Sequence, residues 1–311
     1  MADKVRLGKT DLYVNPVGLG TNAVGGHNIY TMKLDDENGK EIVRTAIRSG
    51  INFLDTAYFY GLGRSEELIG EVVKEMGVRQ EVIIATKGGN VVQNGVRVVN
   101  NSPAALRAHL EESLRRLKTD YIDLYYIHFP DETTPKAEAV GALQRMKEEG
   151  LIRAIGVCNF SLEQLRDANQ DGYLDVIQDH YSLVVRDKEK DVLPFAKAHG
   201  ISFIPYFPLA AGLLTGKYTA ESKFNDGRER RPMFQPGVYE QNIAKVEKLR
   251  EIASAKGAQV AHVALAWYLT RDKIDAVIPG AKRPEQVKDN LKTLDVRLTP
   301  DEIAQIDRIF R

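Results

Sequence analysis

Apolar and polar positions along this 311-residue chain follow two alternating patterns. Short runs rich in β-branched and aromatic residues are each followed by a longer segment with helical spacing of its apolar positions. The first pattern is typical of strands buried on both faces, and the second of amphipathic helices. The runs predict strands at 15–20, 51–57, 81–87, 121–128, 152–160, 174–181, 201–209 and 275–281. The longer segments predict helices at 36–49, 64–76, 103–118, 135–149, 161–171, 187–199, 239–271 (two helices) and 283–293.

Eight strand–helix units in a chain of this length predict a (β/α)8 barrel, with residues 1–311 forming one domain. A doubly wound sheet would need Gly-x-Gly-x-x-Gly at its first helix and an acidic residue about 20 positions later. Both “GLGTNAVG” and “GLGRSEE” miss that spacing. Two segments lie outside the repeat. Residues 5–15 predict a β-hairpin covering the bottom of the barrel, and 215–238 predict a long loop after the seventh strand, which we interpret as a functional lid.

The composition narrows the class of protein. With 43 basic and 43 acidic side chains, the chain has no charge surplus that would attract nucleic acid or an anionic membrane. Its single cysteine excludes an internal disulfide framework and Cys-rich metal sites, and its histidines lack ligand spacing, so we predict no metal. The N-terminal stretch lacks the apolar segment of a secretory signal, and no apolar run is long enough to span a bilayer. We therefore expect a soluble cytoplasmic protein.

Polar residues end several of the predicted strands, where barrel enzymes hold their active sites. In chain order they are Asp55, Lys87, His128, Asn159 and Gln178. Asp55, Lys87 and His128 end three consecutive strands, and Tyr60 follows the first of them. Taken singly, each residue is more typical of a structural role: the aspartate of a turn, the lysine of a solvated strand end and the histidine of a core. Together the four predict a site that moves protons.

The chemistry of this set is specific. A free tyrosine has a pKa of about 10, and a nearby ammonium group lowers it. An ammonium inside a barrel needs a carboxylate partner, or burial would neutralise it. Asp55, Lys87 and Tyr60 therefore predict a tyrosine adapted to general acid–base catalysis, with His128 orienting a carbonyl oxygen. The set has no nucleophile, metal cage or phosphate grip, so a hydride would have to come from a cofactor.

Longer stretches carry a resemblance to a known family. They are “VGLGT”, “FLDTAYFYGLGRSEELIG”, “ATKGG”, “SLRRLKTDYIDLYYIH”, “AIGVCNFSLEQL”, “PLAAGLLTGKY” and “VIPGAKRPEQVKDN”. Over nearly its whole length the chain resembles the aldo-keto reductases, and within them the bacterial general-stress and inositol-operon branch. The resemblance implies a (β/α)8 barrel and NADP(H)-dependent carbonyl reduction. It also implies that Asp55, Tyr60, Lys87 and His128 are the catalytic tetrad, and it alone selects Tyr60 over Tyr58.

The resemblance further implies a cofactor site in three parts. Beside the nicotinamide it places Gly20, Thr21, Asp55, Cys158, Asn159, Gln178 and Tyr206. Along the pyrophosphate it places Phe207, Pro208, Leu209, Gly212, Leu214, Lys217 and, from the lid, Arg228. At the adenosine phosphate it places Gly280, Lys282, Arg283, Gln286 and Asn290.

Several details of that site are specific to this chain. The family stacks an aromatic ring on the nicotinamide, for which Tyr206 is the first candidate and Tyr181 the second. Cys158 stands where the family generally has serine, so one hydrogen bond to the carboxamide would be weaker. The cation pair Lys282 and Arg283 beside a helix start suits a 2′-phosphate and favours NADP over NAD.

Other residues have structural interpretations. We assign Gly61 and Gly63 to a strand-to-helix turn rather than to phosphate binding, because glycine tolerates positive φ. Glu66 would favour the first helical turn electrostatically, and Trp267 would pack in the core. The charge run “RERRP” at 228–232 is open between a solvated surface and a lid function.

The sequence therefore predicts a monomeric enzyme that reduces aldehydes or ketones with NADPH, reversibly with the alcohols. Two alternatives remain open: a Schiff-base aldolase with Lys87 as nucleophile, and a nucleotide-sensing partner protein with little turnover. We expect no additional N-terminal segment for binding such a partner, which counts against the second alternative. The substrate itself is not indicated, although aromatic residues around the expected pocket suggest an apolar one. These residues are Tyr30, Tyr58, Phe59 and Phe129.

Overall fold

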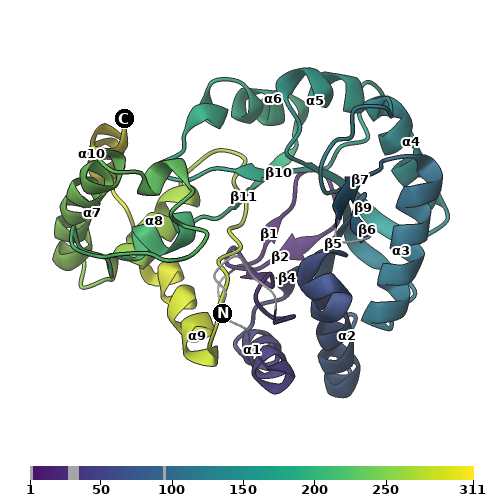
Figure 1. Cartoon of the computed structure of the whole chain (residues 1–311), viewed down its shortest axis with the longest axis horizontal. Helices are drawn as coiled ribbons and strands as arrows, with labels where there is room; N and C mark the ends of the chain where they lie inside the picture. The colour runs from purple at the N-terminus through teal and green to yellow at the C-terminus, as the bar shows by residue number, and fades with distance from the viewer. Residues whose placement is uncertain (1–2, 27–34, 94–95) are drawn as a thin grey trace.

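The computed structural model describes residues 3–26, 35–93 and 96–311. Its main sheet is parallel, in the order β11-β10-β9-β8-β5-β4-β3, and is rolled up inside a ring of helices (Figure 1). The strands are β3 (Leu19–Gly20), β4 (Phe53–Asp55), β5 (Ile83–Gly88), β8 (Ile122–Ile127), β9 (Ile152–Cys158), β10 (Val176–His180) and β11 (Ser202–Tyr206). Seven of the eight predicted strand positions thus contain a regular strand.

The eighth predicted segment, 275–281, closes the barrel without forming a regular strand. It makes isolated parallel bridges, Val17 to Val277 and Gly20 to Gly280, along the first strand position. On its other side the Phe203 amide donates to the carbonyl of residue 273 at 2.6 Å. Pro279 has no N–H to donate, which interrupts a regular ladder. The predicted (β/α)8 barrel is therefore confirmed, and only the regularity of its last strand was wrong.

Helices cover the outside of the barrel at the predicted positions, and one further helix, α10, lies beyond the last predicted segment. They are α1 (Asp36–Arg48), α2 (Arg64–Met76), α3 (Pro103–Leu117), α4 (Lys136–Glu148), α5 (Leu162–Ala168), α6 (Val192–His199), α7 (Val238–Ala255), α8 (Val260–Tyr268), α9 (Pro284–Leu291) and α10 (Pro300–Phe310). Segment 239–271 does contain two helices, whereas the predicted helix 187–199 begins late, after a separate 3-10 turn at Asp187–Glu189. No helix in the described ranges combines the length and apolar character needed to cross a membrane.

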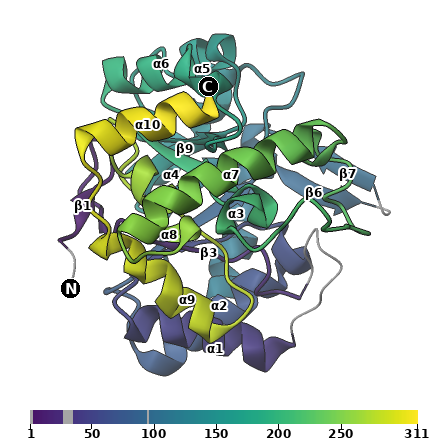
Figure 2. The same ribbon diagram turned by 90° about the vertical axis from the view of Figure 1, so that its left-hand side faces the viewer.

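Two elements were missed by the sequence analysis. α10 begins with a capping box in which Thr299 and Glu302 satisfy each other's backbone amides, so the stretch “TPDE” was a usable indication. α7, α8, α9 and α10 lie together on one side of the barrel (Figure 2).

The second missed element is a hairpin of β6 (Asn90–Gln93) and β7 (Val96–Val99), which follows β5 at the barrel mouth. Its strands flank an Asn-Gly pair, a strong hairpin indication, at positions 94–95 outside the described residues.

The core has two layers, and the predicted N-terminal hairpin closes the inner one. β1 (Val5–Arg6) pairs antiparallel with β2 (Tyr13–Val14). Leu7, Leu12 and Val14 are fully buried against the inward side chains of the barrel strands. The Gly8 amide donates to Ser202 Oγ at 2.5 Å, at the start of β11, which places the hairpin at the bottom of the barrel.

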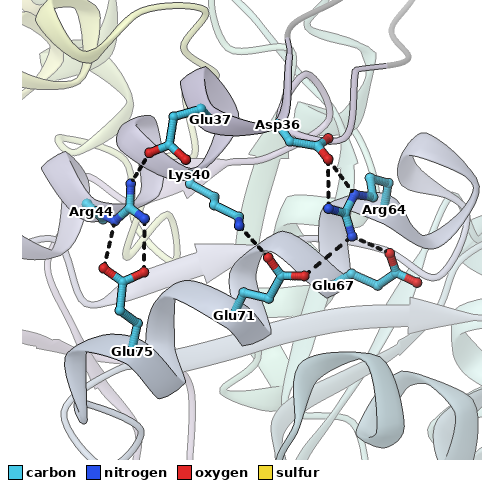
Figure 3. A network of polar contacts seen from close by, with 8 residues as sticks. All are labelled: Asp36, Glu37, Lys40, Arg44, Arg64, Glu67, Glu71 and Glu75. Carbon is cyan, nitrogen blue, oxygen red and sulfur yellow. Dashed lines mark hydrogen bonds and ion pairs between the residues drawn. The ribbon is translucent and has the colours of Figure 1, made fainter.

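A network of ion pairs joins α1 to α2 on the surface (Figure 3). Arg64 donates to Asp36 at 2.7 Å, and Lys40 lies 2.5 Å from Glu71. Arg44 bridges Glu75 and Glu37 with guanidinium-to-carboxylate distances of 2.9 and 2.6 Å. Because Arg64 is the first residue of α2, the network also holds the end of the turn that begins after β4. Such exposed pairs each contribute little to stability, so their role is mainly to fix the two helices together.

Candidate active site

A buried ion pair lies at the carboxyl end of the barrel strands. Lys87, near the end of β5, donates through Nζ to Asp55 Oδ1 at 2.6 Å and to the Thr56 carbonyl at 2.7 Å. Gln178 reaches across from β10, and its Nε2 donates to the other oxygen of Asp55 at 2.8 Å. Lys87 and Asp55 are 1% and 2% exposed, so water contributes almost nothing to their solvation. The pair is held by strands at different positions around the barrel.

The protonation state of Lys87 follows from this pairing. Burial lowers the pKa of the ammonium, but the Asp55 carboxylate 2.6 Å away, together with Tyr60 and Cys158, more than offsets this, so the net pKa lies above that of an ordinary lysine. Lys87 is therefore a permanent cation at neutral pH.

A tight turn carries Tyr60 to this ion pair. Tyr60 begins the 3-10 segment η1 (Tyr60–Gly63), in which three successive residues have left-handed backbone, with φ of 61°, 57° and 99°. A Cβ on Gly61 would lie 2.6 Å from the Gly25 carbonyl oxygen, and one on Gly63 would lie 2.5 Å from the guanidinium carbon of Arg116. The glycines thus serve the turn, as predicted.

The geometry separates the two tyrosines that the sequence spacing could not. The ring of Tyr60 has its centroid 5.3 Å from Lys87 Nζ and 6.0 Å from the ring of His128, edge to face. Tyr58 instead packs in a tilted arrangement against His109, with ring centroids 4.6 Å apart, and the guanidinium of Arg116 lies 4.2 Å from the tyrosine ring. Of these two tyrosines, Tyr60 is the one whose ring lies beside the ion pair.

The pKa of Tyr60 differs from the sequence-based expectation. Burial of the phenol raises its pKa, and the Lys87 ammonium opposes this without reversing it, so the net pKa lies above the ordinary value. The expected effect of Lys87 is present, but desolvation outweighs it. Tyr60 is therefore a phenol, not a phenolate, at neutral pH.

His128 and Asn159 complete the mouth of the barrel. The backbone amide of His128, directly after β8, donates to the Gly88 carbonyl at 2.9 Å. Asn159 follows β9 in a left-handed conformation, φ 62°, so its side chain turns back toward the mouth. Its Nδ2 donates to the His128 carbonyl at 3.1 Å, and its Oδ1 accepts from the Tyr206 hydroxyl at 2.7 Å. The strand-end residues predicted from sequence are thus brought together.

The remaining candidates beside the nicotinamide have contrasting environments. Cys158 is 1% exposed, and burial raises the pKa of its thiol well above the ordinary value, so it is no reactive thiolate. Tyr206 is half-buried at the end of β11 and stacks on His180, with centroids 5.4 Å apart. Tyr181 is fully buried and donates to Glu189 at 2.6 Å within the outer core. The second candidate for nicotinamide stacking was therefore wrong.

The segment after β11 holds the residues assigned to the pyrophosphate. Phe207 and Gly212 have left-handed backbone, with φ of 52° and 94°, so the chain coils tightly there. Leu214 is fully buried in the outer core, and Leu209 packs against that core. A contribution of Leu214 to a cofactor would therefore come from its backbone. The Pro208 carbonyl accepts a hydrogen bond at 2.6 Å from a buried tyrosine of α8.

Cations from the lid and from the last loop gather at one place. Burial lowers the pKa of Lys282, and the nearby charges of Lys217 and Arg228 lower it further. Asp226 partly compensates, with its carboxylate 2.5 Å from the Arg228 guanidinium. Gln286 fixes the same loop by accepting from the Lys282 amide at 2.8 Å. Crowded like charges are unfavourable on their own, so this arrangement fits an anionic ligand.

The remaining predicted cofactor-binding residues lie near the first strand of the barrel and in the last loop and helix α9. Gly20 and Gly280 face each other in a parallel bridge, and a Cβ on Gly20 would lie 2.7 Å from the Ile278 carbonyl oxygen. Thr21 donates through Oγ1 to the Asp55 carbonyl at 2.8 Å. Arg283 is the N-cap residue of α9, and Asn290 lies buried in that helix. Gly20 and Gly280 thus lie at the seam between the first strand and the last loop, and Arg283 begins the helix that follows this loop.

One interaction beside the site was missed, because Glu66 is more than a helix-start residue. Its side chain is fully buried, accepts from Thr86 Oγ1 at 2.6 Å and lies 3.2 Å from Arg116. Arg116 in turn donates to the Tyr58 carbonyl at 3.1 Å, within the turn that carries Tyr60. The interpretation of Glu66 as a purely electrostatic helix residue was wrong. Nothing in the sequence connects it to an arginine 50 positions away.

The expected aromatic pocket is described only in part. Phe129 stacks on His128 with centroids 4.8 Å apart, whereas Tyr58 faces His109. Tyr30 lies outside the described residues. Within the described ranges, no three His, Cys, Asp or Glu side chains gather as a metal ion would require.

In class, this is a (β/α)8 barrel with a buried Asp55–Lys87 pair and Tyr60 at the carboxyl ends of the strands. Residues 16–311 match the model of the Aldo/keto reductase family, and the chain belongs to that family of oxidoreductases, which reduce carbonyls with nicotinamide cofactors. The resemblance noted from sequence is thereby confirmed.

Individual relatives agree with this assignment. The chain is 38% identical over 284 residues to aldo-keto reductase YhdN of Bacillus subtilis strain 168, covering 90% of this chain and 85% of the relative. It is 35% identical to an NADH-specific methylglyoxal reductase of Escherichia coli K12, covering 95% and 94%.

Solved structures agree as well. The glycerol dehydrogenase AKR11B4 from Gluconobacter oxydans matches with a TM-score of 0.90 and 36% identity, over 99% of this chain and 94% of that one. The aldo-keto reductase AKR11C1 from Bacillus halodurans, in its holo form, matches with 0.83 and 29%, over 99% and 96%.

Proposed function

We propose that this enzyme reduces aldehyde or ketone carbonyls to alcohols, reversibly, with NADPH as preferred hydride source and Tyr60 as general acid. One observation carries the proposal: the buried Lys87 ammonium lies between the Asp55 carboxylate and the ring of Tyr60, with His128 at the edge of that ring. This arrangement can deliver one proton to a bound oxygen atom, and it offers no group that would attack carbon.

The residues at the mouth fit a nicotinamide cofactor. The amide of Asn159 contacts the hydroxyl of half-buried Tyr206, and the amide of Gln178 contacts Asp55. Lys217, Arg228 and Lys282 form the cationic cluster that an anionic ligand would relieve. We expect the amides to hold the carboxamide and the cations to hold the phosphates.

When bound, the reduced cofactor supplies a hydride to the carbonyl carbon. Tyr60 holds its proton at neutral pH, because burial raises its pKa. It can therefore donate that proton to the carbonyl oxygen as charge develops there. Lys87 stabilises the phenolate that remains, and Asp55 keeps the lysine charged and in place. His128 orients the carbonyl oxygen toward the tyrosine.

The preference for NADPH is a separate proposal. It rests on Lys282, Arg283 and their neighbour Lys217, whose charges suit an additional phosphate. The Escherichia coli relative is described as NADH-specific, so family membership leaves the preference open. Parallel kinetics with NADPH and NADH over a panel of aldehydes, ketones and sugars would test it. A kcat/KM for NADH equal to or above that for NADPH would contradict it.

The catalytic role of Tyr60 has a matched control in Tyr58. We expect Tyr60→Phe to retain NADPH binding and to lose most carbonyl turnover, roughly a hundredfold or more, because general acid catalysis is removed. Tyr58→Phe should retain turnover, because that ring faces His109 instead of the ion pair. NADPH affinity is measured by fluorescence titration, and turnover by NADPH absorbance. Equal effects of the two substitutions would refute the assignment.

The alternatives make different predictions. A Schiff-base aldolase needs a neutral lysine nucleophile, but Asp55 raises the pKa of Lys87, so borohydride should trap no substrate on it. A nucleotide-sensing protein would retain NADPH tightly and show almost no turnover with any carbonyl in the panel. We further propose that the enzyme is a cytoplasmic monomer, and light scattering after size exclusion would test its oligomeric state.

A further inference from the structure

The charge run at 228–232 contains an arginine that approaches the catalytic end of the site. The guanidinium of Arg231 lies 4.4 Å from the ring centroid of Phe207, which directly follows β11. Phe207 packs edge-on against His180 and Tyr206, at 6.0 and 5.4 Å between ring centroids. Arg231 is half-buried, whereas its neighbour Arg230 is exposed. The lid thus positions one of its arginines against the aromatic group that includes the candidate nicotinamide-stacking ring.

The positive charge of Arg231 acts on that aromatic group. Burial lowers the pKa of His180, and the charge of Arg231 adds to the lowering. Burial raises the pKa of Tyr206, and Arg231 opposes the rise. At the phosphate end, by contrast, the cations that act on Lys282 are Lys217 and Arg228. Arg231 therefore belongs to the catalytic end of the site and not to the cationic cluster.

The carboxylates near the catalytic end already have cationic partners. Asp55 pairs with Lys87 at 2.6 Å, and Asp179 pairs with Lys188 at 2.8 Å. In the described part of the chain Arg231 makes no ion pair within 4.0 Å; its partner is the face of an aromatic ring. An aromatic face holds a guanidinium in place while leaving its N–H groups directed to other acceptors. A half-buried cation of this kind is arranged to bind an anion.

We propose that Arg231 is an anion-recognition residue of the substrate pocket, and that the preferred substrates are carbonyl compounds bearing a carboxylate or phosphate group. The inference rests on the proposed reductase activity and specifies its substrate class. The planar guanidinium can bind such a group through two parallel hydrogen bonds, which fixes the orientation of the carbonyl as well as adding affinity. The cofactor pyrophosphate is another anion that Arg231 could bind, and the test distinguishes this result from substrate recognition.

The test uses two substrates that differ in one charge: para-carboxybenzaldehyde and its neutral methyl ester, methyl para-formylbenzoate. In the wild type we expect the higher kcat/KM for the carboxylate. Arg231→Gln should lower kcat/KM for the carboxylate by roughly ten- to a hundredfold, the usual effect of losing a charge-assisted hydrogen bond, and leave the ester within about twofold. Arg230→Gln, the matched control from the exposed neighbouring position, should change neither.

A second measurement is independent of substrate reactivity. Benzoate should inhibit reduction of the ester competitively in the wild type, with a Ki that rises at least about tenfold in Arg231→Gln and is unchanged in Arg230→Gln. Folding of each variant is checked by circular dichroism, and NADPH affinity by fluorescence titration.

The outcomes separate this inference from the proposed function. If the wild type reduces neither aldehyde with NADPH or NADH, the reductase proposal fails. If it reduces the ester but Arg231→Gln affects both substrates equally, or weakens NADPH binding, Arg231 contacts the cofactor and the inference is overturned. A variant with unchanged kinetics and unchanged benzoate inhibition overturns it as well.

Discussion

The buried pair of Glu66 and Arg116 allows a stability prediction that depends directly on the structure. We expect Glu66→Gln to destabilise the barrel strongly, although it changes the side chain by one atom. The glutamine oxygen could still accept from Thr86, but the amide nitrogen would then face the Arg116 guanidinium, donor against donor. Arg116 would lose the carboxylate that now lies 3.2 Å away.

The magnitude follows from burial. Removing one partner of a buried ion pair costs about 3–5 kcal/mol, because the other charge is left without compensation. Here Arg116 keeps a second carboxylate, Glu112, at 2.9 Å, so the low end of that range, about 3 kcal/mol, applies. Burial also raises the pKa of Glu66, so the charged carboxylate is itself costly to bury. The intact pair therefore has a small net value, and replacing both partners together should cost less than the sum of the single changes.

Urea unfolding followed by circular dichroism measures these free energies for Glu66→Gln, Arg116→Met and the double variant. The control is Glu67→Gln at the next position, where the carboxylate is 39% exposed and pairs with Arg64 on the surface; its loss should be below about 1 kcal/mol. Arg116→Met should also reduce kcat roughly tenfold, because its bond to the Tyr58 carbonyl steadies the turn beneath Tyr60.

Two results would refute this reasoning. If Glu66→Gln and Glu67→Gln destabilise the protein equally, the buried pair has no special role. If the losses of Glu66→Gln and Arg116→Met are simply additive in the double variant, the two side chains do not act on each other.

Three further predictions concern charge. In the proposed mechanism alcohol oxidation uses the Tyr60 phenolate, so its rate should rise with pH toward the raised pKa of the phenol. Lys87→Met lacks the charge that lowers this pKa, so the rise in rate should move to higher pH; a pH–kcat profile that does not move would contradict the role of the ammonium. Lys282→Ala should raise KM for NADPH about tenfold or more and leave KM for NADH nearly unchanged, as parallel titrations would measure, whereas equal effects would place the lysine away from the extra phosphate. Hydrogen bonding to Arg64 lowers the pKa of Asp36, so this contribution to stability is complete above the unfolded pKa of about 4 and is lost as pH falls through the folded pKa. Thermal melts at intervals of about one pH unit between about pH 3 and 7 test this. The Tm of Arg64→Gln should fall less steeply toward acid pH than that of the wild type, and an identical fall would show that the Asp36–Arg64 pair does not contribute.

Most of the fold could be predicted from the sequence, because the barrel strands are nearly continuous apolar runs with few competing interpretations. The alternation of side chains along the strands also indicates which residues face the barrel interior. In β10, alternation turns Val176 and Gln178 into the barrel and Ile177 outward, and continuing it places Tyr181 outward too. That parity alone would have excluded Tyr181 from stacking on a cofactor. Asn159 breaks the parity, since its left-handed backbone turns it back toward the mouth.

The features that could not be predicted from the sequence depend on long-range contacts. The sign of the shift in the Tyr60 pKa is a competition between burial and Lys87, and burial cannot be measured before the fold is known. Glu66 and Arg116 look like ordinary charged helix residues until packing buries one against the other. The position of Arg231 requires a long loop to return over β11, which no local pattern predicts.

The placement of the Asp55–Lys87 pair also bears on why it exists. Along β4 and β5 the inward positions are Phe53 and Asp55, then Ile83, Ala85 and Lys87, so each strand changes from apolar to charged in its last inward layer. For stability alone, an apolar pair in that layer would serve as well or better, because burying two charges costs more than their attraction usually returns. A fold that places a fully buried ammonium directly above an apolar plug, with both Asp55 oxygens occupied, therefore gains nothing in stability from it. Under the proposed function, its use is a cation held beside Tyr60 whose pKa is raised by the same carboxylate.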